Sequence, residues 1–227
     1  MLLVVDNVEV NVSKKSIKHL HLYVKPPDGR VEVSAPHRIP QNEIEDFIKS
    51  KMNWIRKHQN RFAKLSQPQV HKYITGERLD IWGDPYVLEV RYSNKGNFMQ
   101  ICDNRIILTV REKSTTKQRG RYVKEWYRSI LKHEIEKLLP RWEQTTGLRS
   151  SSWQIKDMKT RWGTCNIETE KLWFNLQLAK KPLICLEYVI LHELIHLIER
   201  YHNHRFASLM DRYMPNWREV KQILNGS

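Results

Sequence analysis

The feature that most constrains this chain is an apolar helical segment, residues 183–198, with an H-E-x-x-H sequence from His192 to His196. Leucine, isoleucine and valine occur on nearly every side of the expected helix, and a helix that is apolar all round is buried. Histidines four residues apart lie on one helix face, about one turn apart. Two imidazoles and a carboxylate inside a core need partners, and a metal ion can supply them.

The spacing is typical of a hydrolytic zinc site. Zn²⁺ bound by His192 and His196 lowers the pKa of a bound water, and Glu193 beside the ligand face can take up the proton without being a ligand. The sequence therefore predicts a zinc-dependent hydrolase with Zn²⁺ as cofactor and Glu193 as general base. The alternative is an incidental match on a surface helix, against which the apolar surroundings argue.

A catalytic zinc needs a third protein ligand, and three residues compete for this position. We favour His202, because the chain is expected to turn after the helix and Asn203 fits the N-cap of the next one. A ligand just before that cap can point back at the metal. His204 also lies within reach. Glu199 is one turn beyond His196, but three ligands along two turns of one straight helix would converge poorly.

The charge balance suggests a second kind of partner. The 227 residues have a net charge of +14, which favours polyanions such as nucleic acid or nucleotides. Four basic residues spaced three, four and four apart lie along one face of an expected helix and are candidate polyanion contacts: Arg121, Lys124, Arg128 and Lys132. Such a stripe is more often the solvated side of a helix.

Three features of the sequence indicate a cytoplasmic protein. Its three cysteines, Cys102, Cys165 and Cys185, are too few and too scattered for a disulfide framework. The start of the chain lacks the features of a signal peptide, and no apolar run has membrane-spanning length. We therefore expect a cytoplasmic location and no membrane partner. Nothing in the sequence indicates an oligomeric state.

Hydrophobic periodicity and turn residues divide the chain into three regions. Residues 1–66 read as strands with a Pro26–Gly29 turn and one helix over residues 41–64, and the polar stretch 66–69 ends the region. Residues 67–115 read as antiparallel strands, and residues 116–227 as a hydrolase domain. The predicted class is α+β, and the three regions are also compatible with one continuous domain. No internal repeat is visible.

The last region has its own expected order of elements. A polar basic link over residues 111–121 precedes a helix that runs to about residue 144. Strands follow at residues 153–158 and 172–178, and helices then begin near Pro182, Asn203 and Pro215.

Several stretches carry a likeness to known proteins. They are DMKTRWGTC at residues 157–165, LWFNLQL at 172–178, HELIHL at 192–197, His202 and MPNW at 214–217, with weaker likeness at residues 28–36 and 54–55. In these stretches the chain resembles the YgjP-like family of metal-dependent hydrolases, which belongs to the wider SprT/WLM-type zincin group. Thr164 departs from the serine common in the family. Around His202 the family commonly has Asn-His-Ser, where this chain has Tyr-His-Asn.

The resemblance implies a zincin-like, minigluzincin-type metallopeptidase core that follows antiparallel β regions and a helix. It also implies zinc held by His192, His196 and His202, with Glu193 as general base and protein or peptide as substrate. Two other functions stay open: hydrolysis of a nucleotide phosphoanhydride, and a DNA-associated protease or nucleic-acid-binding module with a zinc site.

Residues around the motif have further expected roles. Arg161 is a candidate contact to an anionic intermediate, a substrate carboxylate or a phosphate. Asn175 is a candidate for a hydrogen bond to a metal ligand or to substrate backbone. The strand at 172–178 is a candidate edge for an extended peptide. For Cys165 we expect a small buried thiol.

Overall fold

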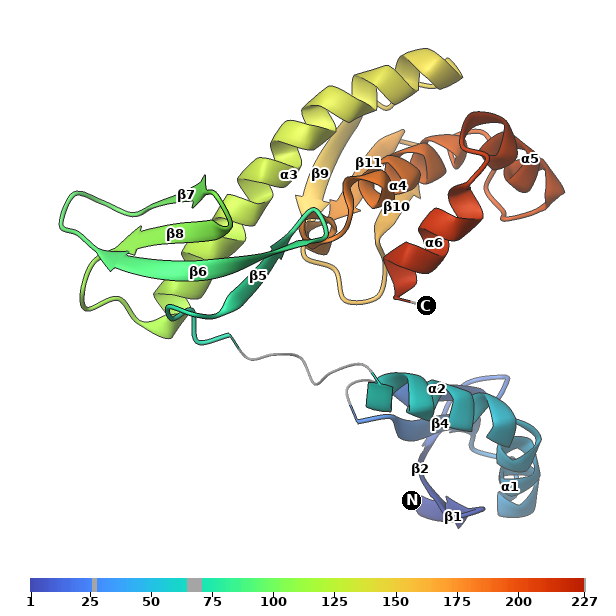
Figure 1. Ribbon diagram of the computed structural model, residues 1–227. Coiled ribbons are helices and arrows are strands. Elements are labelled where there is room, and N and C mark those ends of the chain that lie inside the picture. The colour runs from blue at the N-terminus through green and yellow to red at the C-terminus, as the bar shows by residue number, and fades with distance from the viewer. Residues whose placement is uncertain (26–27, 65–70, 227) are drawn as a thin grey trace. The chain divides into compact units, whose positions relative to one another are not determined.

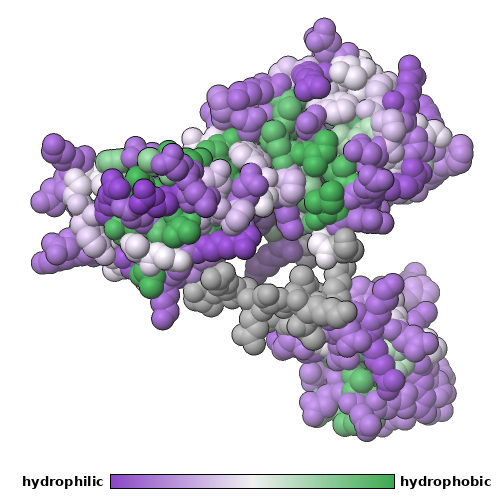
Figure 2. Space-filling model, viewed as in Figure 1, coloured by the Kyte–Doolittle hydropathy of each residue, from purple (hydrophilic) through white to green (hydrophobic). Residues whose placement is uncertain are grey.

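Residues 1–25, 28–64 and 71–226 are described in the computed structural model, and the chain divides into two compact units, Met1–Val70 and His71–Ser227 (Figure 1). Each unit has its own hydrophobic core. The surface of the described residues that is visible in Figure 2 is mainly hydrophilic. The polar break predicted at 66–69 and the Pro26-Pro27 part of the predicted turn lie outside the described residues. The α+β class is confirmed.

A four-stranded sheet and two helices form the first unit. The strands are β1 (Leu2–Val5), β2 (Val8–Lys15), β3 (His21–Lys25) and β4 (Arg30–Pro36), in the order β1-β2-β4-β3. Alternate residues face the core, as the period-two pattern predicts, with Val10, Val12 and Val33 buried. The helices are α1 (Gln41–Ser50) and α2 (Met52–Lys64).

The prediction of a single helix over residues 41–64 is wrong at Lys51. This residue leaves helical geometry with φ −105° and ψ 5°, and its amide donates to the Ile48 carbonyl at 3.0 Å. Ile44, Ile48 and Met52 are all buried at spacings of four residues. This spacing is also that of the apolar stripe of one continuous helix, so periodicity alone does not reveal the break.

The second unit begins with another four-stranded sheet and a long helix. The strands are β5 (Arg78–Ile81), β6 (Asp84–Tyr92), β7 (Phe98–Cys102) and β8 (Arg105–Val110), and the helix is α3 (Thr116–Thr146). The helix begins inside the link predicted over residues 111–121. Thr115 and Gln118 form a capping box, in which each side chain bonds to the other residue's backbone amide. This signal corrects the predicted start of the helix.

The two sheets share one topology, an internal repeat that is not visible in the sequence. The strand orders are β1-β2-β4-β3 and β5-β6-β8-β7. In both, the outer strands pair antiparallel and the two central strands pair parallel. The expected antiparallel regions are therefore mixed sheets. The hairpin β3-β4 pairs with β2 through β4, and the hairpin β7-β8 pairs with β6 through β8. Hydrophobic alternation along a strand is the same in parallel and antiparallel pairing, so the sequence does not distinguish them.

A three-stranded sheet follows α3 in the chain. Its strands are β9 (Ser152–Lys156), β10 (Gly163–Asn166) and β11 (Lys171–Asn175), in the order β10-β11-β9. The prediction of residues 172–178 as an edge strand is wrong, because β11 is central and Leu176–Lys180 form a 3-10 helix, η1. The Asn175 side chain caps this helix by accepting from the Gln177 amide at 3.1 Å. At the β9 edge, the Arg128 guanidinium donates to the Ile155 carbonyl at 2.8 Å.

Three helices complete the second unit: α4 (Leu183–Ile195), α5 (His204–Tyr213) and α6 (Trp217–Asn225). Helix α4 packs against α3, α5, α6, η1 and β10, so it occupies the centre of this unit. The prediction that a helix apolar on all sides lies in the core is confirmed for its aliphatic residues, since Leu186, Ile190 and Leu194 are fully buried. The H-E-x-x-H sequence lies at the end of this helix.

Candidate metal centre and cleft

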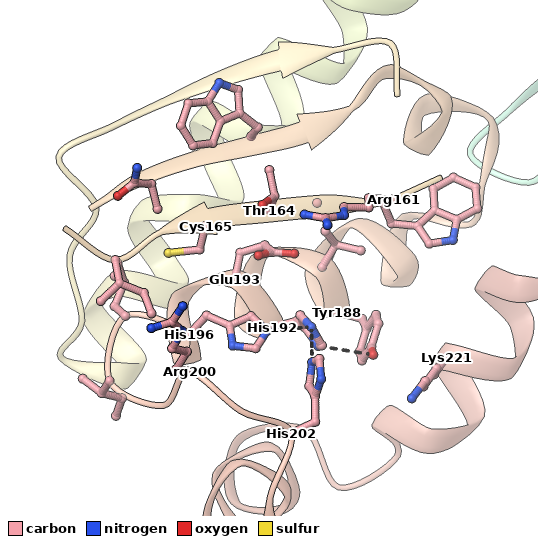
Figure 3. Close-up of a pocket in the computed structure, with 18 of the residues that line it drawn as sticks. Arg161, Thr164, Cys165, Tyr188, His192, Glu193, His196, Arg200, His202 and Lys221 are labelled. Atoms are coloured by element: carbon pink, nitrogen blue, oxygen red, sulfur yellow. Dashed lines mark hydrogen bonds between the residues drawn. The ribbon is translucent and has the colours of Figure 1, made fainter. Parts of the chain in front are cut away.

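Helix α4 presents its two histidines on one face. His192 and His196 are one turn apart, and their Nε2 atoms lie 3.1 Å from each other. The side chain of Glu193 points beside them and is 4% exposed (Figure 3). The regular helix ends at Ile195, and His196 is its C-cap. The expected turn away from the helix direction therefore begins earlier than the sequence suggests.

His202 joins this pair from the loop between α4 and α5. Its Nε2 lies 3.0 Å from Nε2 of His192, and one nitrogen from each of the three imidazoles lies within 4.8 Å of the others. Asn203 is the N-cap of α5, and its side chain accepts from the Phe206 amide at 3.0 Å. The Phe206 ring packs 4.8–5.0 Å from all three imidazoles. A polar cap and an apolar contact thus hold His202 in place.

The two competing candidates for the third position lie differently. The Glu199 carboxylate accepts from the Tyr201 amide at 3.3 Å and lies 4.0 Å from the Arg205 guanidinium. His204 is the first residue of α5, and its Nδ1 lies 3.5 Å from the Ser208 hydroxyl. Among the described residues, the only group of acidic, histidine and cysteine side chains arranged to hold an ion is His192, His196 and His202.

The backbone fixes the tautomer of His196. Its Nδ1 lies 2.9 Å from the carbonyl oxygen of Glu199. Because a carbonyl oxygen can only accept, Nδ1 carries the proton and Nε2 keeps a free lone pair. The lone pair therefore points toward the other two histidines.

Tyr188 lies one turn before His192 on α4, and its hydroxyl oxygen is 3.4 Å from His192 Nδ1. The phenol ring stacks on Trp217 of α6, with an interplanar angle of 5°. The indole N–H of Trp217 donates to Asp211 at 2.8 Å. A chain of contacts thus connects the side chain of His192 to α6.

Burial shifts the pKa values of His192 and Glu193. Burial first, and then the neighbouring His196 and His202, lower the pKa of His192 to about 3. Burial raises the pKa of Glu193 to about 8, which the charge of Arg161 partly opposes. A neutral imidazole has the lone pair that metal coordination requires, so burial keeps His192 ready to bind an ion.

A cleft of about 1090 Å³ opens over these side chains. Strand β10 forms one wall, and Gly163 at its start is unusually close to α4. A Cβ atom at this position would lie 2.5 Å from Glu193 Oε1 and 2.8 Å from Val189 Cγ1. Glycine therefore allows the strand backbone to pass directly over Glu193. The backbone N–H and C=O groups of β10 that point away from β11 make no backbone hydrogen bond within the described residues. This strand therefore has a free edge in the cleft.

Arg161 and Asn175 have different positions relative to the cleft. Arg161 lines it near Glu193 (Figure 3). Asn175 is 4% exposed and does not line it. Its side-chain oxygen accepts from the Met158 amide at 3.3 Å, and its side-chain nitrogen donates to the carbonyls of Met158 at 2.9 Å and Arg161 at 2.6 Å. Asn175 thus fixes the loop that carries Arg161.

The basic stripe of α3 is largely paired. Lys124 lies 2.8 Å from Asp157. Arg128 bonds to the backbone of β9, as described above, and lies 3.3 Å from Glu125. Lys132 lies 3.6 Å from Glu136. Of the stripe, Arg121 alone has no acid within salt-bridge distance in the described part of the chain, and its guanidinium carbon lies 5.8 Å from the Tyr122 ring centroid.

Sequence reasoning did not identify three residues of the cleft. Tyr188 could have been found, because it lies four residues before His192 and so shares its helix face. Arg200 and Lys221 line the cleft from a loop and from α6. The sequence holds no local signal for either, since both reach the cleft through tertiary packing alone. Cys165 also lines the cleft and is half-buried, and burial raises the pKa of its thiol to about 11.

Comparison with known proteins identifies the class. Residues 18–227 match the family described as YgjP-like, metallopeptidase domain. The match covers most of the chain, and the chain belongs to this family. Its members form a class of metal-dependent peptidases, which confirms the resemblance found in the sequence. No curated protein matches the chain.

Two solved structures are similar over a part of the chain. The metallopeptidase zymogen abylysin of Pyrococcus abyssi is 18% identical, with a TM-score of 0.37, and the match covers 39% of this chain and 89% of that one. The metallopeptidase zymogen jannalysin of Methanocaldococcus jannaschii is 23% identical, with a TM-score of 0.37, covering 40% and 94%. In the described ranges, no helix combines the length and apolar character needed to cross a membrane.

Proposed function

We propose that this protein is a zinc-dependent peptidase with His192, His196 and His202 as metal ligands and Glu193 as general base. The observation that carries the proposal is the convergence of three imidazole nitrogens beside a buried carboxylate. Two nitrogens bound to one tetrahedral zinc lie about 3.3 Å apart. The distances of 3.1 and 3.0 Å from His192 to the other two rings fit this ion.

Glu193 carries the proton transfer in this proposal. Bound zinc would supply a water of lowered pKa, would polarise the scissile carbonyl and, as a nearby positive charge, would favour the carboxylate form of Glu193. Glu193 would take up the proton of the attacking water and return it to the leaving amine. The proximity of Gly163 to its carboxylate brings the backbone of β10 next to the reacting atoms. The low exposure of Glu193 keeps bulk water from competing for the proton.

The free edge of β10 supports a peptide substrate. An extended peptide can add to this edge and satisfy its unpaired backbone groups, which aligns the scissile bond along the cleft. The edge replaces the strand at 172–178 that the sequence suggested for this role. A nucleotide has no backbone amides to pair with the strand, so the geometry favours peptide hydrolysis over phosphoanhydride hydrolysis.

Two variants test this function against wild type. Glu193→Gln keeps all three imidazoles, so we expect it to retain one zinc per chain and to lose roughly 10²–10⁴-fold in peptide hydrolysis. His202→Ala is expected to lose both zinc and activity. The measurements are elemental analysis and turnover of a fluorogenic peptide library. Retained hydrolysis by pure Glu193→Gln protein, or full zinc content in His202→Ala, would contradict the proposal.

A further inference from the structure

We infer that the cleft selects acidic peptide segments through three cationic side chains, Arg161, Arg200 and Lys221. This inference rests on the proposed peptidase function and names the substrate class of the same site. The three residues come from separate elements: the loop before β10, the loop after α4, and helix α6. Their convergence on one cleft therefore depends on the tertiary fold.

The charge of the cleft is predominantly positive. Besides the three cations, its charged lining residues are Glu168 and Glu193. Glu193 interacts electrostatically with Arg161, and Glu168 is the other acid, so the three cations outnumber the acids in the lining. A bound divalent metal adds further positive charge. Such a cleft attracts acidic segments and repels basic ones.

The three cations are without acidic partners. Nowhere in the described ranges does an acid lie within salt-bridge distance of any of them. Aromatic rings support two of them instead. The Arg200 guanidinium carbon lies 5.8 Å from the Tyr201 ring centroid, and Lys221 Nζ lies 5.7 Å from that of Trp217. Their charge is thus available to a ligand.

The positions of the cations match a peptide laid along β10. Arg161 lies beside Glu193 at the start of the strand, and Arg200 lies near His196 toward its other end (Figure 3). Lys221 faces the cleft from α6 on the side of Tyr188 and His202. A peptide on the strand edge would pass a cation on either side of the metal centre. We therefore expect acidic residues to be favoured on both sides of the scissile bond.

Three matched peptides test the preference. They share one cleavable core and carry Glu, Gln or Lys at the positions that flank it. At low ionic strength we expect kcat/KM to fall in the order Glu, Gln, Lys, with about tenfold between the Glu and Lys peptides. Added salt should shrink the ratio, because exposed charges are screened. Equal hydrolysis of all three peptides would overturn the inference while leaving the peptidase proposal standing.

Charge reversal assigns the preference to the cleft. Arg200→Glu should lower the Glu-to-Lys ratio of kcat/KM about tenfold. Arg212→Glu is the matched control: Arg212 also lies over the ring of the tyrosine that follows it, at 5.3 Å, and is outside the cleft. It should keep the wild-type ratio. Lys221→Gln gives an independent second variant if Arg200→Glu fails to fold. Equal effects of Arg200→Glu and Arg212→Glu would overturn the inference.

A binding measurement separates the two proposals. Zinc-loaded Glu193→Gln protein is titrated with the three fluorescently labelled peptides, and anisotropy is recorded. Tighter binding of the Glu peptide, without hydrolysis of any peptide by wild type, would sustain the acidic preference and refute the peptidase function. Equal affinity for all three peptides would refute the preference.

Discussion

At the residue scale, the candidate site depends on where protons lie before a metal arrives. The Glu199 carbonyl fixes the proton of His196 on Nδ1. If Nε2 of His192 is also a ligand, its Nδ1 carries the proton and can donate to the Tyr188 hydroxyl. The rings of His196 and His192 would then be oriented by the Glu199 carbonyl and the Tyr188 hydroxyl. Tyr188 acts as a positioning residue in this arrangement.

Removing the Tyr188 hydroxyl tests this role. We expect Tyr188→Phe to weaken zinc binding about tenfold, because partners of ligating histidines typically contribute 10- to 100-fold in metal affinity. Competition with a chromogenic chelator measures the change. Tyr213→Phe removes a hydroxyl from α5, outside the cleft lining, and serves as the control. Equal zinc affinity of Tyr188→Phe and wild type would exclude the role.

Gly163 gives a second prediction at this scale. In Gly163→Ala the new methyl group would collide with both Glu193 and Val189, so strand or carboxylate must shift. A displacement of about 1 Å near reacting groups can cost on the order of 10²-fold in rate. We expect this loss in kcat/KM with zinc content unchanged, since no histidine is touched. Wild-type kcat/KM in Gly163→Ala would show that the clearance has no catalytic importance.

At the element scale, the sequence predicts those features that local periodicity encodes. The mainly apolar residues 183–198 predict α4, and Asn203 predicts the N-cap of α5. The pairing partners of strands are not encoded in this way. Alternation in residues 172–178 is the same in an edge strand and in a central one, and only the tertiary packing places β11 between β9 and β10. Lys221 is likewise brought to the cleft by the packing of α6 against α4.

Asp157 connects α3 to the loop that carries Arg161. Its carboxylate lies 2.8 Å from Lys124 Nζ and accepts from the side-chain Nε2 of Gln177 at 3.0 Å. The hydrogen bond from Lys124 lowers the pKa of Asp157. The resulting stability is present above the unfolded-state pKa and is lost as the pH falls through the folded-state value.

We expect Asp157→Asn to lower the free energy of unfolding by at most about 1 kcal/mol at pH 7, because both side chains are partly exposed. The difference from wild type should disappear in acid, below the folded-state pKa of Asp157. Urea unfolding at a series of pH values from 7 downward measures how this difference changes. Asp84→Asn removes an exposed carboxylate that has no ion pair in the described part of the chain, and is the control. A difference that persists in acid would contradict the assignment.

At the scale of the whole molecule, the two units have separate hydrophobic cores. Their first sheets have one topology, yet the candidate ligands all lie in the second unit. Ligand binding stabilises only the structure that it binds to. Zinc should therefore stabilise the second unit selectively.

Calorimetry can detect this selectivity. We expect two thermal transitions, and chelation of zinc should lower the midpoint of the one that belongs to residues 71–227. The other midpoint should stay the same. Tryptophan fluorescence can assign the transitions, since Trp54 is the single tryptophan of the first unit. A single transition that shifts as a whole would indicate that the two units unfold cooperatively.

The cleft is assembled from several elements that lie between Arg161 and Asn225 in the chain. During synthesis, the first two histidines of the centre leave the ribosome before His202, and α6 follows later still. A nascent chain that has exposed α4 but not α6 lacks one wall of the cleft and one of its cations. The order of translation therefore delays a complete cleft until nearly all of these residues have emerged.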